Sequence, residues 1–250
     1  MRLGWVALAL MTGCGRYAFD PLAAPPDTGD TGITALAHWS FDEGMGTTTR
    51  DLTGGGHDLT LVNSPTWTAG MFDSALIVDA AAMQYLEAPP VDLGHTTSVT
   101  VSMWFIHAYG AGVPFDHLFE LSDDFNLHTD AFGMFPDDTQ DCGAPELLLS
   151  MQGDVGLSSA CYEQPSSNTW HHLVAVFDKS QPSCCELALY IDGVLQQPAS
   201  LLNTSDNTNA FGIAPIYLFA RGGTGSFSDG VIDELVLIDR ALTPAEIAAL

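Results

Sequence analysis

Apolar residues recur at every second position in several short stretches of this chain. In residues 99–105 they occupy one face, while residues 172–177 and 187–191 carry apolar side chains on both faces. A period of two is typical of β-strands, and strands that are apolar on both faces are typical of the interior of a two-layer sandwich. These stretches predict an all-β sandwich. We expect further strands near residues 59–62, 75–78, 83–88, 117–121, 146–151, 155–162, 216–219 and 230–238.

Only the end of the chain has a helical pattern. Thr243 can cap a first turn in which Pro244 is tolerated and Glu246 completes a capping box. We therefore expect one short C-terminal helical turn beside the sandwich.

The two ends of the strand-rich region carry similar patterns. Residues 37–44 and 230–242 are short apolar stretches interrupted by acidic residues where each strand leaves the core. This pairing predicts that the first and last strands of one domain lie side by side. No proline-rich or charge-rich break divides residues 35–250, so we expect a single domain over that range.

The start of the chain has the layout of a secretory signal. A positively charged beginning is followed by an apolar run, Leu3–Leu10, that is far shorter than the roughly 20 residues needed to span a bilayer. Because this run ends on Thr-Gly-Cys, it resembles a bacterial lipoprotein signal, in which the cysteine receives the lipid. We expect a signal peptide at 1–13, lipidation of Cys14 and a disordered tether at 14–34. The protein would then be lipid-anchored in the bacterial cell envelope, on the extracytoplasmic side. An ordinary cleaved signal is the alternative.

The charge of the chain limits its partners. Its 31 acidic residues face 6 basic ones, which gives a formal net charge of −25. A surface of this sign repels phosphate backbones, so we expect no nucleic-acid partner. Most aspartates lie beside Gly, Pro, Ser or Asn, where a carboxylate stabilises turns, and such loops also suit cations that prefer oxygen ligands.

Besides Cys14, the chain has four cysteines: Cys142, Cys161, Cys184 and Cys185. An even number in an exported chain favours disulfides over thiol catalysis, and the lack of a C-x-x-C pair argues against zinc. Because Cys142 and Cys161 flank a predicted hairpin, we expect them to be joined. The adjacent Cys184 and Cys185 then bridge each other or pair elsewhere.

Several motifs occur in a characteristic order. They are AHWSFDEGMGT at 37–47, GHDLTL at 56–61, SVTVSMWF at 98–105, WHHLVAVFD at 170–178, LYIDG at 189–193 and GVIDEL at 230–235. Together they resemble the laminin-G-like, concanavalin A-like jelly roll domain over about residues 35–250. The resemblance implies two antiparallel sheets of about six or seven strands each. It also implies a concave face and rim loops that bind glycans or proteins in many relatives, and often one structural calcium.

Asp42 and Asp233 are the candidate metal ligands. Each interrupts its strand at an equivalent edge, and adjacent first and last strands would bring the two carboxylates together. Two carboxylates at close range repel, and a shared calcium ion lets both stay ionised. We therefore expect a structural calcium here, with carbonyl oxygens near Glu43 and Gly44 completing its shell. Exposed turn residues without a metal are the alternative.

The sequence favours binding over catalysis. Glycoside hydrolases with this sandwich use alternating carboxylates on one strand, whereas Asp233 and Glu234 are consecutive and Asp239 is too distant. The chain has no Ser nucleophile elbow, Walker loop or H-E-x-x-H motif.

We expect a non-catalytic binding or adhesion module that recognises glycans. The alternatives are a structural or protein-interaction surface lipoprotein without a sugar ligand, and a glycoside hydrolase relative. The loop aromatics best placed for recognition are Tyr109, Phe115, Phe135, Phe211 and Phe227.

Overall fold

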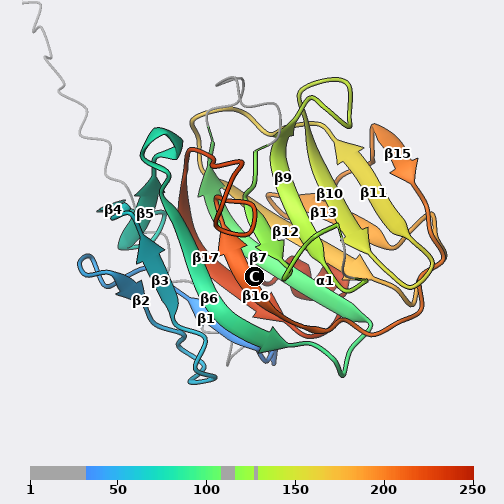
Figure 1. Ribbon diagram of the computed structural model, residues 1–250, viewed down its shortest axis with the longest axis horizontal. Coiled ribbons are helices and arrows are strands. Elements are labelled where there is room, and N and C mark those ends of the chain that lie inside the picture. Colours follow the sequence, from blue (N-terminus) through green and yellow to red (C-terminus); the bar gives the residue numbers. More distant parts are fainter. Residues whose placement is uncertain (1–31, 108–115, 127–128) are drawn as a thin grey trace, which may run out of the picture.

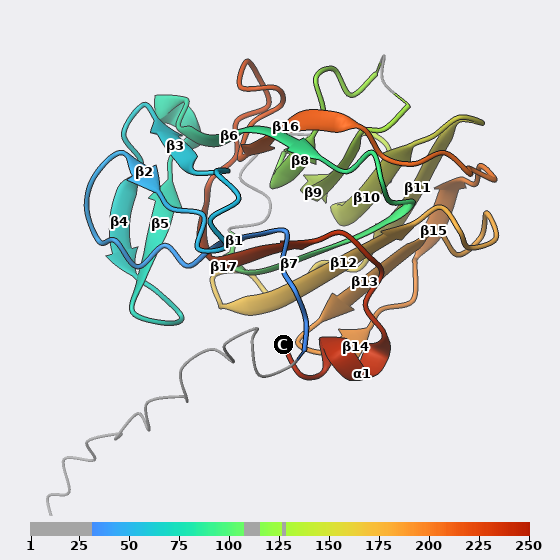
Figure 2. The ribbon, with the colours of Figure 1, turned by 90° about the horizontal axis from the view of Figure 1, so that it is seen from below.

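The computed structural model describes residues 32–107, 116–126 and 129–250. Within them two β-sheets pack face to face, and Figures 1 and 2 show the two layers. The prediction of an all-β sandwich is confirmed.

Among the described residues, one sheet has eight strands and the other has nine. The eight-stranded sheet runs in the order β14 (Val194–Leu195), β13 (Leu187–Ile191), β12 (His171–Asp178), β7 (Ser98–Ile106), β17 (Gly230–Ile238), β5 (Ser74–Val78) and β4 (Thr66–Ala69), and β1 (Ala37–Trp39) also pairs with β17. The nine-stranded sheet runs β15 (Ser200–Asn203), β11 (Leu157–Tyr162), β10 (Glu146–Gln152), β9 (Phe132–Asp138), β8 (Phe119–Leu121), β16 (Ile213–Leu218), β6 (Tyr85–Asp92), β3 (Leu59–Val62) and β2 (Thr48–Thr49).

The strand pairs within both sheets are antiparallel, as expected for a jelly roll. Each sheet is larger than the six or seven strands that the sequence suggested. The difference arises because short strands at the sheet edges, β2, β14 and β15, lengthen the two sheets. A 3-10 turn, η1 (Ala80–Ala82), precedes β6.

The first and last strands lie side by side, as the matched ends predicted. Ala37 of β1 is opposite Leu237 of β17, and Trp39 is opposite Leu235. β17 also pairs with β5 and β7, so the last strand runs through the interior of its sheet. Closure of the sandwich therefore depends on contacts between the two ends of the domain.

Aromatic side chains fill the space between the sheets. Trp39, Phe105, Phe119, Phe132 and Phe177 are each at most 1 % exposed. Phe132 of the nine-stranded sheet contacts Phe177 of the eight-stranded sheet, with ring centroids 4.8 Å apart. Burial of each such side chain contributes roughly 1.5–3 kcal/mol, so these contacts supply much of the attraction between the layers.

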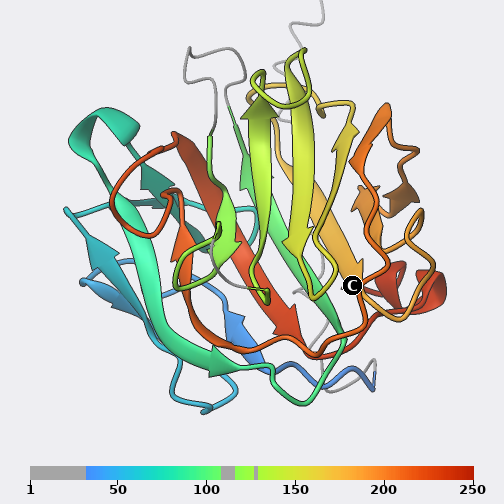
Figure 3. The ribbon, with the colours of Figure 1, turned by 45° about the vertical axis from the view of Figure 1, so that its right-hand side comes forward.

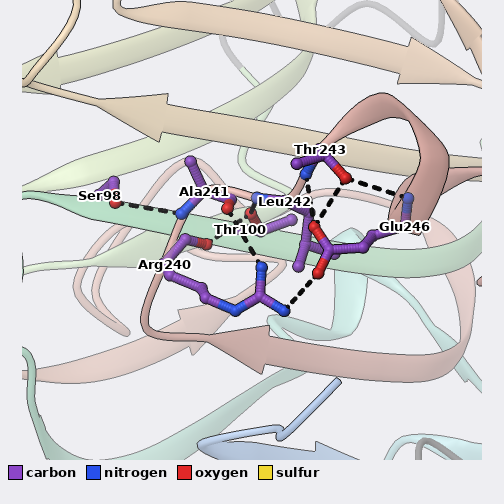
Figure 4. Close-up of polar contacts among 7 residues, drawn as sticks. All are labelled: Ser98, Thr100, Arg240, Ala241, Leu242, Thr243 and Glu246. Atoms are coloured by element: carbon purple, nitrogen blue, oxygen red, sulfur yellow. Dashed lines mark hydrogen bonds and ion pairs between the residues drawn. The ribbon is translucent and has the colours of Figure 1, made fainter. Parts of the chain in front are cut away.

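The C-terminal turn, α1 (Pro244–Ile247), is capped as predicted. Thr243 accepts the N–H of Glu246 at 3.3 Å, and the Glu246 carboxylate accepts the N–H of Thr243 at 2.8 Å. Figure 4 shows that Arg240 also binds Glu246, at 2.7 Å, while Thr100 of β7 bonds to the segment before the turn. The turn is thereby fixed against the outer face of the eight-stranded sheet.

This packing explains why β12 and β13 are apolar on both faces. Val174 and Tyr190 point away from the sandwich core and form a second buried cluster with Ile238 and Ile247. A layer made by the C-terminal segment therefore covers the outer face of these strands.

The predicted signal at 1–13 and Cys14 lie outside the described residues, as does the predicted tether up to residue 31. Within the part of the chain that the structure describes, no helix is both long and apolar enough to cross a bilayer.

His172 of β12 is a buried, titratable group on the outer face of the eight-stranded sheet. It is 8 % exposed, stacks on Trp104 with ring centroids 5.1 Å apart, and its Nε2 lies 2.8 Å from the Ser102 hydroxyl. Burial lowers the pKa of His172 to about 4, although the Asp192 carboxylate acts in the opposite direction. The folded protein therefore favours the neutral imidazole.

We predict that His172 makes the protein acid-labile. Between the ordinary pKa of about 6.5 and pH 4, the unfolded chain binds a proton that the folded protein does not bind. The free energy of unfolding should therefore fall by up to about 3 kcal/mol as the pH falls through this window. Urea unfolding at pH 7 and pH 4.5 should show a smaller loss for His172→Gln. An unchanged loss would contradict the prediction.

His95→Gln provides the control. The His95 side chain is 55 % exposed and pairs with Asp239 on the surface, so its replacement should change the same pH dependence by less than about 1 kcal/mol.

Candidate functional site

A groove with a volume of about 660 Å³ lies on the outer face of the nine-stranded sheet. Strands β9, β10 and β11 supply its floor, and they lie side by side in Figure 3. Loop residues from four other parts of the chain surround it, among them Asn126, Gln140, Arg221 and Ser226. The groove is therefore assembled from segments that are far apart in sequence.

The floor follows from the alternation of side chains along two neighbouring strands. Inner positions of β9 and β10, such as Met134 and Leu149, fill the sandwich core. The intervening positions therefore point outward, which places Phe135 opposite Leu148 in the groove. Phe125 packs edge-on against Phe135, with ring centroids 5.7 Å apart, and the floor is largely apolar.

Polar side chains continue the same outward-facing rows. Ser150 and Gln152 follow Leu148 at every second position along β10, and both line the groove. Gln140 and Asp141 line it from the loop between β9 and β10. Hydroxyl and amide groups thus border the apolar floor on more than one side.

A disulfide fastens the loop that carries Gln140 and Asp141. The structure joins Cys142 to Cys161, which faces outward from β11, with a Cα–Cα distance of 5.9 Å. Asp138 adds a hydrogen bond, because its Oδ1 accepts the N–H of Asp141 at 2.7 Å. One wall of the groove is therefore tied to the sheet that forms its floor.

The other two cysteines pair with each other. Cys184 and Cys185 form a vicinal pair before β13, which is the first of the two arrangements that the sequence left open. Among the described residues, Cys142, Glu146 and Cys161 are close enough to suggest a metal site. The bond between the two cysteines leaves no thiolate there to hold zinc.

A buried histidine–carboxylate pair supports the groove from within. His117 Nε2 lies 3.2 Å from Glu120 Oε2, and both side chains are 1 % exposed. The Ser122 hydroxyl donates to the other oxygen of Glu120, and the His117 ring packs edge-on against Phe135. These contacts fix the segment that enters β8 beside the apolar floor.

Asp233 lies at an irregular point of β17. Its pairing with β7 shifts register between Asp233 and Val236, and Glu234 has a φ of 49°. Such a β-bulge turns side chains away from their regular faces. Glu234 binds His38 at 2.9 Å, whereas Asp233 is completely buried and its Oδ2 accepts the N–H of Phe72 at 3.0 Å. The two consecutive carboxylates therefore have different partners.

Asp233 lacks a full set of partners for an ionised carboxylate. Its Oδ1 is buried and has no hydrogen-bond partner among the described residues. Burial raises the pKa of Asp233 to about 8, and the charges of Glu234 and Asp42 act in the same direction. An ionised Asp233 would therefore be stabilised by a cation beside it.

The loop between β4 and β5 lies against both predicted metal ligands. The N–H of Ser74 donates to Asp42 Oδ1 at 3.3 Å. Three oxygens converge beside Gly70, because the carbonyl oxygens of Phe72 and Ser74 and Asp233 Oδ2 all lie within 2.6 Å of the position that a Cβ on Gly70 would take. Carboxylate and carbonyl oxygens are the type of ligand that calcium takes. The two carbonyls belong to the β4–β5 loop and the first residue of β5, which no sequence motif marks as metal-binding.

The predicted loop aromatics do not gather at one place within the described residues. Phe135 lies in strand β9 and not in a loop, and it is 1 % exposed where it lines the groove, whereas Phe211 is 2 % exposed in the core. Phe227 packs beside Tyr85, with ring centroids 6.1 Å apart. Tyr109 and Phe115 lie outside the described residues.

The groove is not evident from the sequence because β9, which forms part of its floor, lacks a clear strand pattern. Its strand pattern, Phe132-Gly133-Met134-Phe135, runs into Pro136 and two aspartates, which read as a loop. Alternation in the first four of these residues is the one signal that could have revealed the strand.

A family model described as the concanavalin A-like lectin/glucanases superfamily matches residues 79–248. No curated protein matches the sequence.

Solved structures from several kinds of protein share the fold. Domain 4 of AbnA, a GH43 extracellular arabinanase from Geobacillus stearothermophilus in complex with arabinotriose, matches with a TM-score of 0.62 and 18% identity, over 86% of this chain and 97% of that one. The binding domain of botulinum neurotoxin DC in complex with SialylT matches with a TM-score of 0.63 and 8% identity, over 87% and 51%.

Trypanosoma rangeli sialidase in complex with the inhibitor DANA matches with a TM-score of 0.58 and 15% identity, over 86% and 32%. The chain thus spans nearly all of the AbnA domain, about half of the toxin domain and about a third of the sialidase. At these identities the likeness shows the fold.

Proposed function

Because the chain belongs to the concanavalin A-like lectin/glucanase superfamily, we propose that it is a non-catalytic glycan-binding module whose site is the groove over β9, β10 and β11. The observation that carries this proposal is the combination of an apolar floor with a polar border. Phe125, Leu148 and Leu157 line the groove together with hydroxyl and amide side chains. Sugar rings have apolar C–H faces and hydroxyl edges, so they complement such a surface.

The size of the groove agrees with this ligand class. Its volume of about 660 Å³ lies within the roughly 300–1,000 Å³ that is typical of small-molecule sites. The complexes of the AbnA domain with arabinotriose and of the toxin domain with SialylT support glycan binding as a use of this fold. A shared fold does not by itself establish a function, however, so the proposal depends on the residues that line the groove.

We predict that the protein binds oligosaccharides through the amides of Gln140 and Gln152. An array of plant and animal oligosaccharides that includes arabinotriose should give a positive signal for the folded domain. The double variant Gln140→Ala/Gln152→Ala should bind the best array ligand at least about tenfold more weakly, since two hydrogen bonds of about 1 kcal/mol each are lost. Titration calorimetry with that ligand measures the change.

Gln197→Ala is the matched control, because Gln197 is an exposed amide outside the groove. Its affinity should equal that of the wild type. A blank array, or equal affinities for the groove variant and the control, would count against a glycan site here.

We also propose that the chain holds a structural calcium ion between Asp42, Asp233 and the loop at residues 70–74. Three observations support it: the unpartnered Oδ1 of Asp233, the raised pKa of that carboxyl, and the carbonyl and carboxylate oxygens that converge beside Gly70. Bound calcium would balance the charges of the two carboxylates and tie the β4–β5 loop to β17.

Calcium should therefore raise the melting temperature. At a concentration about 100 times the Kd, the ion stabilises the fold by about 2.7 kcal/mol, which corresponds to roughly 5–10 °C for a chain of this size. Scanning calorimetry of protein treated with EDTA, before and after addition of calcium chloride, measures the shift. Asp233→Asn should abolish it, whereas Asp239→Asn, at a partly exposed aspartate just after the same strand, should preserve it. No shift in the wild type would refute the site.

We further propose that lipidation of Cys14 anchors the module in the bacterial cell envelope. The support is the apolar run that ends on Thr-Gly-Cys. In a bacterial host, the wild-type protein should partition into the detergent phase of Triton X-114 and incorporate labelled palmitate, while Cys14→Ser should do neither. A variant that still partitions into detergent would exclude this anchor.

A further inference from the structure

The groove contains an arginine that has no acidic partner within the described residues. Arg221 lies in the connection between β16 and β17 and lines the groove. The ion pairs among the described residues do not involve it. No carboxylate among the described residues therefore neutralises the guanidinium, which can pair with an anionic ligand.

Cationic side chains are scarce in this chain, which makes the position of Arg221 notable. The chain has 6 basic residues against 31 acidic ones. Lys179 is buried and donates to Thr129 and Asn209, and Arg240 is paired with Glu246. Arg221 is thus a cation with five possible N–H donors and no ion pair to any described residue, in a setting where carboxylates are abundant.

The charge of the groove differs from that of the whole molecule. Of the residues that line it, Arg221 and Asp141 carry opposite formal charges, while the whole chain has a net charge of −25. No ion pair joins these two described residues. An anionic ligand would therefore meet much less repulsion in the groove than over an average part of the surface.

The backbone holds Arg221 in a tight turn. Its N–H donates to the carbonyl of Gly225 at 2.8 Å, and its carbonyl accepts the N–H of Thr224 at 3.0 Å. Gly222 and Gly223 have φ values of 53° and 67°, a left-handed conformation that glycine adopts without strain. The turn places the start of the arginine side chain at a defined point of the groove wall.

Two residues without this freedom flank the same turn. Phe219 has a φ of 63° and Ser226 a φ of 47°, which are unfavourable for residues with a Cβ. Phe219 is 1 % exposed, and its carbonyl accepts the N–H of Ser228 at 3.0 Å, so packing holds it in this conformation. Strain of this kind tends to be retained at binding sites, where it fixes a functional group.

Hydroxyl and amide side chains around Arg221 are suited to bind the hydroxyl groups of a sugar. Ser226 lines the groove from the same turn, and Ser150, Gln152 and Asn126 line it from other segments. A guanidinium binds a carboxylate through two parallel hydrogen bonds, whereas hydroxyl and amide groups bind sugar hydroxyls.

We propose that the ligand is an acidic glycan and that Arg221 binds its carboxylate. The inference rests on the proposed function, because it specifies the class of sugar that the same groove recognises. A uronic acid and a sialic acid both supply the required group.

The test compares each acidic sugar with its neutral counterpart. Calorimetric titrations would use oligogalacturonides against the same oligosaccharides after reduction of their carboxyl groups, and sialyllactose against lactose. Wild-type protein should bind at least one acidic sugar at least tenfold more tightly than its neutral counterpart. The comparison that shows this difference tells whether the carboxylate belongs to a uronic acid or to a sialic acid. Arg221→Gln should remove this preference, because the affinity for the acidic form should fall at least tenfold relative to that for the neutral form.

Arg221→Lys should keep only part of the preference, because an ammonium retains the charge but loses the paired hydrogen bonds. Arg50→Gln, at an exposed arginine outside the groove, should behave as the wild type. Circular dichroism of each variant checks that the fold is intact.

Binding of neutral and acidic sugars with equal affinity would overturn the carboxylate assignment and leave the glycan function standing. A preference for the acidic sugar that persists in Arg221→Gln would also overturn the assignment of the carboxylate to Arg221. A lack of binding to every acidic and neutral sugar, both here and on the array, would overturn both proposals.

Discussion

Strand β17 is the element on which the rest of the sandwich depends. It makes ladder hydrogen bonds with β1, β5 and β7, and it therefore joins the first strand to the interior of the eight-stranded sheet. Its bulge at Asp233 interrupts the regular pattern and directs a buried carboxylate toward the β4–β5 loop. The strand that closes the fold thus also carries a buried carboxylate that is costly to ionise.

The two sheets have different roles beyond their shared core. The outer face of the eight-stranded sheet is covered by the C-terminal segment, whose residues Leu242 and Ile247 pack on Val174 and Val176. Within the described ranges, no such layer covers the outer face of the nine-stranded sheet over β10, and there the groove is found. Covering one face with the chain itself leaves the other available for a ligand.

Much of the fold could be predicted from sequence because its strands alternate clearly. The pairing of Ala37 with Leu237 and the cap at Thr243 follow from local patterns that a single sequence displays. The groove could not be predicted in this way. In β10, leucines occupy three consecutive positions, so the sequence does not indicate which of them faces outward. The pairing of Leu148 with Phe135 in the structure shows that Leu148 does. Arg221 was missed because its role depends on a turn whose place over the sheet is a tertiary property.

The bond between Cys142 and Cys161 links the shape of the groove to the redox state of its surroundings. The two sheets close through aromatic packing and strand pairing, neither of which requires oxidation of a thiol. The loop with Gln140 and Asp141, in contrast, is fastened to β11 by that single covalent link and by the hydrogen bond at Asp138. A chain kept in a reducing compartment would therefore have its sandwich but not a fixed groove wall. Completion of the groove wall therefore requires an oxidising environment.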